Sequence, residues 1–281
     1  MKKIFLPLLS TLLLAACSGD KKSAQSMYEQ AQQYYNAGDY VAATQWIDSI
    51  SVTYPQEVEV IRNGMLLQCN VNQKRYEKEL LTIDSLYNAN NALISSLKPQ
   101  FTLHREGSYQ SVGNYIYKGL PIAGETTRSE LRVHVTENGE LQLTSVYCGN
   151  DNINHTGITV TTASGSVSTQ AVAYDGKKNY RYKAGDKCVE LVTYNLEQCR
   201  DVLDAITANL DNKVTVKYNG KGSHTITLDK KMRQAIASSY ELSTAMLQVD
   251  SLHSRREYSI LQLELADRQL MKLQENAEKV D

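Results

Sequence analysis

Residues that could do chemistry are present, but none stands at the spacing that a catalytic or metal site needs. The five histidines form no HExxH pair, and the chain has no CxxC pair. Gly220-Lys221-Gly222 lacks the length and the following Ser or Thr of a phosphate-binding loop, and no serine stands in a GxSxG turn. We therefore expect no metal, no cofactor and no catalytic residue. The alternative is a hydrolase whose residues meet only in the folded chain.

Cys17 has the most specific sequence context. A basic start at Lys2-Lys3 and an apolar stretch from Ile4 to Ala16 precede it, which is the layout of a secretory signal peptide. Leu14-Ala15-Ala16-Cys17 resembles the lipobox of bacterial lipoproteins, and the resemblance implies cleavage before Cys17 and acylation of that residue. Ser18, rather than Asp, follows, which in that family implies sorting to the outer membrane. Whether the chain faces the periplasm or the cell surface stays open.

Tyrosine dominates the aromatic residues, with 18 Tyr against 2 Phe and 1 Trp. Many of them lie in the strand-rich part of the chain, where an exposed row of flat rings would suit a glycan or a peptide. The alternative is that tyrosine simply favours half-buried strand positions. The candidate ligand surface consists of Tyr115, Tyr117, Tyr174, Tyr180 and Tyr182.

Four cysteines remain once Cys17 is acylated, namely Cys69, Cys148, Cys188 and Cys199. An even number in an exported chain permits two disulfides. Cys69 and Cys199 lie among apolar residues, however, and would equally suit buried thiols. The pairing of the four stays open.

Three serines stand in Asp48-Ser49-Ile50, Asp84-Ser85-Leu86 and Asp250-Ser251-Leu252. These triplets resemble the O-glycosylation motif that one group of gut-associated Gram-negative bacteria uses on exported proteins. The resemblance implies glycans on Ser49, Ser85 and Ser251. Ordinary neighbours on an amphipathic helix would give the same triplets.

The composition limits the class of protein and its partners. The 281 residues are 42% hydrophobic and 22% charged, enough to bury one or two cores. A formal net charge of -1 gives no basic field for nucleic acid. The apolar stretch of residues 4–16 is too short to cross a bilayer. The expected partners are the membrane, through the acyl chains on Cys17, other envelope proteins and, in the alternative, a glycan or peptide.

Residues 26–99 show helical spacing. Two apolar runs on either side of Gly38 predict an αα-hairpin, and the segment from Ala31 to Pro55 resembles one tetratricopeptide repeat (TPR). A second, degenerate repeat is expected over residues 58–86, with its turn at residues 70–73. Residues 74–97 predict a long helix, which Pro99 ends.

An apolar ladder near the C-terminus predicts a helix from about Asp229 to about Glu278. We expect this helix and residues 74–97 to form an antiparallel, coiled-coil-like pair. Residues 74–97 cover only part of its length, so Ile260, Leu263 and Leu270 should pack against the hairpin at residues 27–50. Association with a second copy is the alternative.

Residues 100–228 change to an alternating, β-branched sequence that predicts about ten strands. Asn138-Gly139 between two alternating runs is a strong hairpin signal. One amphipathic helix, residues 196–210, interrupts the series. Such a meander predicts a mostly antiparallel β sandwich or partial barrel.

These patterns together predict an α+β protein with a TPR-like helical hairpin, a long-helix stalk and an inserted β domain. The expected divisions are a lipoprotein signal peptide (1–16), a lipidated cysteine and tether (17–25), a helical part (26–99), the β-rich insert (100–228) and a C-terminal helix (229–281). Such a chain is expected to be a non-enzymatic, membrane-anchored envelope lipoprotein that presents its β module for protein–protein interaction or scaffolding. The alternative function is capture of a carbohydrate or peptide nutrient.

Overall fold

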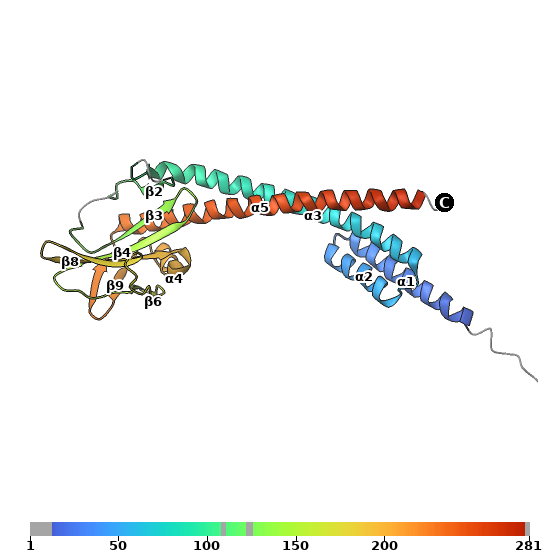
Figure 1. Ribbon diagram of the computed structural model, residues 1–281, viewed down its shortest axis with the longest axis horizontal. Coiled ribbons are helices and arrows are strands. Elements are labelled where there is room, and N and C mark those ends of the chain that lie inside the picture. Colours follow the sequence, from blue (N-terminus) through green and yellow to red (C-terminus); the bar gives the residue numbers. More distant parts are fainter. Residues whose placement is uncertain (1–12, 108–110, 122–125, 279–281) are drawn as a thin grey trace, which may run out of the picture. The chain divides into compact units, whose positions relative to one another are not determined.

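The computed structural model describes residues 13–107, 111–121 and 126–278 (Figure 1). Residues 1–12, most of the predicted signal peptide, lie outside the described residues. The helices are α1 (Leu13–Asn36), α2 (Tyr40–Thr53), α3 (Val58–Leu97), the 3₁₀ turn η1 (Lys98–Gln100), α4 (Leu196–Thr207) and α5 (Lys230–Glu278). The strands are β1 (Phe101–His104), β2 (Asn114–Tyr117), β3 (Glu130–Thr136), β4 (Leu141–Gly149), β5 (Gly157–Thr162), β6 (Gly165–Ser168), β7 (Asn179–Ala184), β8 (Lys187–Asn195), β9 (Thr215–Asn219) and β10 (Ser223–Thr227).

The chain forms two compact units. Of the described residues, 13–86 and 252–278 make the first, which we call the helical unit, and those between 87 and 251 make the second, the β unit. The predicted α+β class is therefore confirmed. The β unit extends beyond the expected insert of residues 100–228, because the end of α3 and the first part of α5 belong to it.

In the helical unit, α1 and α2 form the expected hairpin. Gly38 has a positive φ of 78°, which glycine adopts without strain, and the Asp39 carboxylate caps α2 by accepting from the Ala42 N–H at 3.0 Å. Ala31 and Ala43 are fully buried where the two helices meet. Residues 17–25, expected to be a tether, belong to α1, and Ala24 is already fully buried.

The turn predicted at residues 70–73 is wrong, because α3 runs without interruption from Val58 to Leu97. No glycine or proline stands at the expected turn, and Val71 is fully buried in the cluster that contains Ala31 and Ala43. The packing of Val71 therefore favours a continuous helix.

Also in the helical unit, the second half of α5 packs against α3. Arg256 Nε donates to Asp84 Oδ1 at 2.9 Å, and Gln73 Nε2 donates to Asp267 Oδ1 at 2.5 Å. The prediction that this half of α5 packs against the hairpin at residues 27–50 is wrong, because its observed contacts are with α3. Since α3 begins at Val58 instead of Lys74, it is long enough to provide the partner surface itself.

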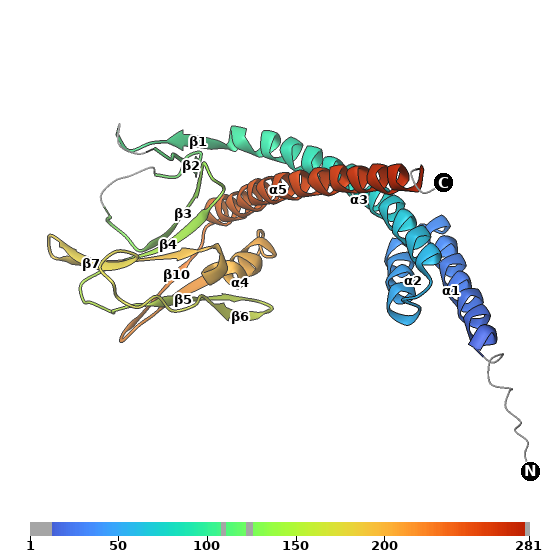
Figure 2. The ribbon, with the colours of Figure 1, turned by 45° about the vertical axis from the view of Figure 1, so that its right-hand side comes forward.

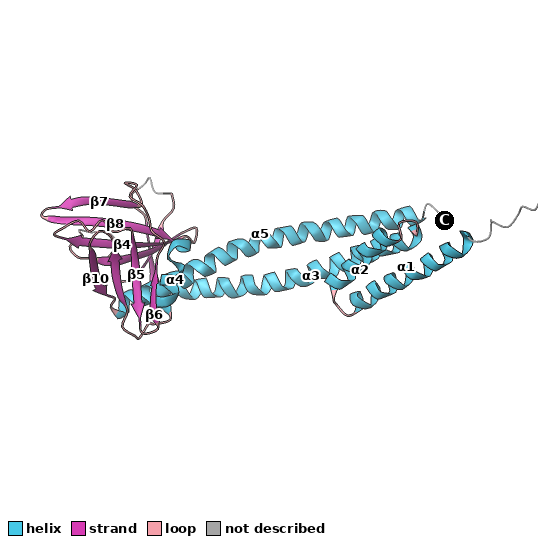
Figure 3. Ribbon diagram, turned by 90° about the horizontal axis from the view of Figure 1, so that it is seen from below, coloured by secondary structure: helices cyan, strands magenta, loops and turns pink. Residues whose placement is uncertain are grey.

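Two antiparallel sheets make up most of the β unit (Figure 3). The first has the order β1-β2-β3-β4-β8-β7 and the second the order β10-β9-β5-β6. The predicted Asn138-Gly139 turn joins β3 to β4, with Gly139 at a φ of 84°. Because β7 is last in the strand order of the larger sheet, it is an edge strand.

The core of the β unit lies between the two sheets. Leu143 and Val192 from the larger sheet meet Ile158 and Val216 from the smaller one, and all four are fully buried. The amphipathic helix α4 closes this core with Cys199, Val202, Leu203 and Ile206. Figure 2 shows α4 beside the two sheets. Because the two sheets pack around a shared core, the β unit has the architecture of a sandwich.

The first part of α5 belongs to the β unit and begins one residue after Asp229, whose carboxylate caps it through the Met232 N–H at 2.7 Å. Ala235 and Ile236 of α5 are fully buried in the core between the sheets. A second cluster joins Leu242 and Ala245 to Ile94 of α3. The β unit therefore depends on both long helices.

Candidate functional site

The five tyrosines of the predicted ligand surface do not form one surface. Tyr115 and Tyr117 lie on β2, are half-buried, and pack against the cluster of Ile94, Phe101 and Leu242. Strand β2 is separated from the edge strand β7 by three strands of the same sheet. These two tyrosines therefore have the half-buried strand role that was the alternative interpretation.

The other three tyrosines gather at β7. Tyr180 and Tyr182 are 38% and 41% exposed, and their rings lie 6.0 Å apart with planes 17° from parallel. Tyr174, in the connection before β7, is 61% exposed, and the Arg181 guanidinium carbon lies 4.9 Å from the centre of its ring. The structure thus brings together Tyr180 and Tyr182, whereas Tyr174 contacts Arg181, which alternates with them along β7 and points to the other face of the sheet. Arg181 is a cation that the sequence prediction did not include.

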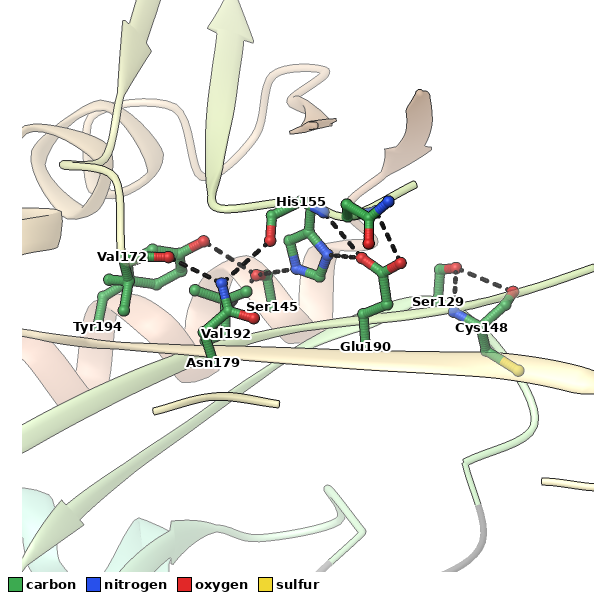
Figure 4. Close-up of polar contacts among 10 residues, drawn as sticks. Ser129, Ser145, Cys148, His155, Val172, Asn179, Glu190, Val192 and Tyr194 are labelled. Carbon is green, nitrogen blue, oxygen red and sulfur yellow. Dashed lines mark hydrogen bonds and ion pairs between the residues drawn. The ribbon is translucent and has the colours of Figure 1, made fainter. Parts of the chain in front are cut away.

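A buried polar array crosses the core of the β unit (Figure 4). Ser145 Oγ lies 2.9 Å from His155 Nε2, and His155 Nδ1 lies 2.9 Å from Glu190 Oε2. Tyr194 Oη is 3.1 Å from the same serine oxygen. The order hydroxyl, imidazole, carboxylate is that of a hydrolase triad.

The backbone around Asn154 holds the carboxylate of this array. Asn154 and His155 both donate their backbone N–H groups to Glu190, each at 2.8 Å. Asn154 has a φ of 54°, which a residue other than glycine seldom adopts. Burial raises the pKa of Glu190, but the hydrogen bonds from the His155 side chain and these two backbone groups outweigh burial and hold that pKa below its ordinary value.

Nothing in this array reaches solvent. Ser145, His155 and Glu190 are each 0% exposed, and burial raises the pKa of Tyr194 to about 12. Asn179, also fully buried, donates to the backbone oxygens of His155 and Val172 at 3.3 and 2.8 Å. A nucleophile must meet its substrate, so this geometry supports a structural network that ties β4, β8 and the connection before β5 together.

Sequence reasoning missed this array because its members come from three separate segments. Ser145 and Glu190 lie on β4 and β8, where cross-strand pairing turns both toward the smaller sheet. His155 reaches them through the turn at Asn154. No local motif connects these three positions, so no short-range pattern could have found them.

The four cysteines left open by the sequence are all free thiols in the described chain. Cys148 pairs across strands with Val189, and Cys188 pairs with Gly149, so the register turns the two cysteines to opposite faces of the sheet. Burial raises the pKa of Cys69, and it raises that of Cys199 to about 12. Such thiols are poor nucleophiles.

The three candidate glycosylation serines lie on three different helices, α2, α3 and α5. Ser49 is half-buried, and its hydroxyl donates to the Gln45 carbonyl oxygen at 2.7 Å. Ser85 and Ser251 are exposed. Glycosylation at these sites stays a prediction.

Within the described ranges, no group of three or more His, Cys, Asp or Glu side chains is placed to hold a metal ion. The helices of those ranges include none that is both long and apolar enough to cross a membrane. The side chain of Cys17, the candidate lipidation site, is not among those described.

Comparison with known proteins assigns the segment around Cys17. Residues 1–18 match the family described as the prokaryotic membrane lipoprotein lipid attachment site. A search of curated proteins found no significant match. The chain is therefore a lipid-anchored membrane lipoprotein, with Cys17 as the cysteine of the matched segment.

Proposed function

We propose that this lipoprotein sits in the outer membrane and works without catalysis, by binding other proteins of the cell envelope. Ser18, following the lipidated cysteine, supports the choice of membrane. The burial of Ser145, His155 and Glu190 supports a function that does not depend on chemistry at that array. The observation that carries the proposal is an exposed apolar stripe on α5 in the helical unit.

This stripe, which we call the α5 stripe, consists of Tyr258, Leu261 and Leu265. Their exposed fractions are 57%, 58% and 42%. Steps of three and four residues place them on one side of the helix. Large apolar groups aligned in this way are typical of a surface that another helix covers.

The opposite side of α5 is already buried within the protein. Leu252, Ser259 and Ala266 recur every seven residues and are 6%, 0% and 1% exposed. The small Ser259 and Ala266 side chains allow a neighbouring helix to approach closely. The helix thus has one buried seam and one largely exposed seam, in which the Tyr258 ring lies 6.4 Å from the Tyr76 ring of α3 and Leu261 and Leu265 stay exposed. The occupant that fits the exposed seam is an amphipathic helix of another envelope protein.

A photo-crosslinking amino acid at position 261 tests the proposal in cells that produce the full lipoprotein. We expect a covalent adduct with a different envelope protein, identified by mass spectrometry, and its loss when Leu265→Glu is added. The matched control places the same crosslinker at Val52, which is 81% exposed on α2.

An adduct of twice the lipoprotein's own mass would replace the proposed partner by a second copy. Absence of any adduct at position 261, with the protein present at its normal level in the membrane, would contradict the proposal.

A second candidate function is favoured by the exposed tyrosines at β7. Tyr174, Tyr180 and Tyr182 support capture of a carbohydrate or peptide by the β unit. The two functions use different units and do not exclude each other.

A further inference from the structure

The face of the larger sheet that points away from the smaller one carries side chains of β4, β8 and β7, of which Val146 and Val189 are fully buried. Residues opposite each other in antiparallel strands share a face, and the register pairs Gln142 with Asn195, Thr144 with Thr193 and Tyr180 with Leu191. Since Ser145 and Glu190 point to the core between the sheets, these residues point outward. We call this surface the outer face.

A cavity of about 610 Å³ opens at the start of β4 and the end of β8, where the outer face meets α4 and α5. Leu141, Leu196 and Leu247 form the apolar part of its lining. Gln142, Thr193 and Asn195 line it from the sheet, and Lys177 and Lys178 line it from the connection before β7. Glu140 and Glu197 are also part of the lining, so the charges within the cavity balance. Side-chain amides and hydroxyls of this kind suit a ligand that is rich in hydroxyl groups.

Positive charge accumulates beside this cavity. Residues 174–187 contain five basic and two acidic residues, in a chain whose net charge is -1. The Asp175 carboxylate accepts hydrogen bonds from the backbone N–H groups of Lys177 and Asn179, with N···O distances of 2.8 and 2.9 Å. These hydrogen bonds lower the pKa of Asp175. Asp175 therefore stays ionised, and the excess of basic over acidic residues leaves the segment with a positive formal charge.

Most of these cations have no anionic partner. The Lys187 ammonium group donates to Asn150 at 2.6 Å. Within the part of the chain that the structure describes, Lys177, Lys178, Arg181 and Lys183 form no ion pair. Arg181 and Lys183 alternate with Tyr180 and Tyr182 along β7 and so point to the other face of the sheet, whereas Lys177 and Lys178 line the cavity on the outer face. Two lysines without an ion pair near exposed tyrosine rings are complementary to an anion with flat apolar faces.

We propose that the outer face binds an acidic polysaccharide. Its sugar rings stack on Tyr180 and Tyr182, its hydroxyl groups meet Gln142, Thr193 and Asn195, and its acidic groups lie near the free lysines. Stacking on tyrosine suits a sugar because the ring provides contact area with little loss of side-chain entropy. The proposal gives the second candidate function a ligand class and is independent of the partner proposed for α5.

An acidic peptide is the competing ligand, since β7 is an edge strand and a peptide could extend the sheet. Two observations favour the polysaccharide. Arg181 and Lys183 stand on β7 itself, and charged side chains on an edge strand discourage strand addition. In addition, the amide and hydroxyl side chains lie on the sheet face, where an added strand would not contact them.

The test uses the purified full lipoprotein in detergent micelles and isothermal titration calorimetry. The probes are alginate oligosaccharides, which carry a carboxylate on each sugar, neutral dextran oligosaccharides of the same length, and hexaglutamate. We expect alginate to bind at least tenfold more tightly than dextran or hexaglutamate, with an affinity that falls as salt is added.

Two double variants locate the site. Tyr180→Ala with Tyr182→Ala, and separately Lys177→Gln with Lys178→Gln, should each weaken alginate binding at least tenfold, and the lysine variant should also flatten the salt dependence. The control, Lys213→Gln with Lys221→Gln, removes two exposed lysines elsewhere on the β unit and should leave binding unchanged. Circular dichroism establishes that each variant is folded.

Each other outcome overturns the proposal. Equal binding of dextran and alginate would make the surface a neutral-sugar site. Tighter binding of hexaglutamate, lost in the same variants, would make it a peptide site. Alginate binding that survives both variants, or no alginate binding by the folded wild type, would show that the outer face is not a binding site for an acidic polysaccharide.

Discussion

Glu190 shows how one side chain organises the core of the β unit. Its carboxylate accepts from two backbone N–H groups and lies within hydrogen-bond distance of one imidazole nitrogen, so the charge is stabilised locally although the residue is fully buried. The arrangement requires the unusual backbone of Asn154. A buried charge held in this way is costly to disturb, because its hydrogen-bond donors would be left without an acceptor.

Replacing Glu190 by Gln should destabilise the β unit by about 2 kcal/mol at pH 7, since the amide puts a donor against donors. The pKa of Glu190 is lowered in the folded chain. Its contribution to stability is therefore complete above the ordinary value of 4.5 and is lost as the pH falls toward the lowered folded value. Urea unfolding from pH 7 to pH 3, followed by near-ultraviolet circular dichroism, should show the difference between wild type and variant shrinking below pH 4.5.

The control for this experiment is Glu264→Gln on the exposed side of α5, which should leave the unfolding curve unchanged at every pH. A difference between wild type and Glu190→Gln that stays constant down to pH 3 would show that the charge of Glu190 does not act as described.

At the scale of elements, α5 has two seams with different expected energetics. Leu263 and Leu270 are half-buried, whereas Leu261 and Leu265 belong to the exposed α5 stripe. Substituting Leu263 and Leu270 by Ser should cost about 1 kcal/mol each, since about half of each side chain leaves an apolar environment. The same change at Leu261 and Leu265 should cost little.

Thermal melts of the two double variants in a soluble chain starting at Ser18 measure this contrast. We expect a melting temperature lower by a few degrees for Leu263→Ser with Leu270→Ser, and an unchanged mass in solution. Equal melting temperatures for the two variants would contradict the assignment of the seams. A dimeric wild type that becomes monomeric in the Leu263→Ser, Leu270→Ser variant would replace packing within the chain by self-association.

The β unit needs its helical flanks. A fragment of residues 101–228 lacks Ala235 and Ile236, which are fully buried in the core between the sheets, and it also lacks the cluster around Leu242. We expect a fragment of residues 87–251 to melt cooperatively with a mixed helix and strand spectrum. The shorter fragment should melt at a lower temperature or without cooperativity, and an equal melting temperature for both would show that the flanks are dispensable.

Local patterns predicted the elements well where the signal was local. The Asn138-Gly139 hairpin and the start of α5 after Asp229 need only neighbouring residues, and both are present in the structure. The continuity of α3 depends instead on Val71 packing into the α1–α2 hairpin, which no short window contains. The Ser145–His155–Glu190 array and the cavity beside Lys177 depend on strand register and escaped prediction for the same reason.

At the scale of the whole molecule, attachment to the membrane rests on one residue. Cys17→Ala should leave the chain unprocessed or soluble, because it removes the cysteine of the matched lipid attachment site. Membrane fractionation with detergent partitioning measures this. A variant whose signal peptide is still cleaved and which still partitions into detergent would contradict the assignment of the anchor.

Ala24, fully buried in the α1–α2 hairpin, limits the freedom of the anchored protein. Only six residues separate it from Cys17. The path between the two is about 10 Å long as a helix and about 25 Å long if fully extended. The helical unit therefore diffuses in the membrane plane together with the acyl chains on Cys17. Its encounters with proteins in the same leaflet occur by diffusion in two dimensions. Local concentrations on the order of millimolar follow from such short attachments, so even a weak contact at the α5 stripe would be occupied much of the time.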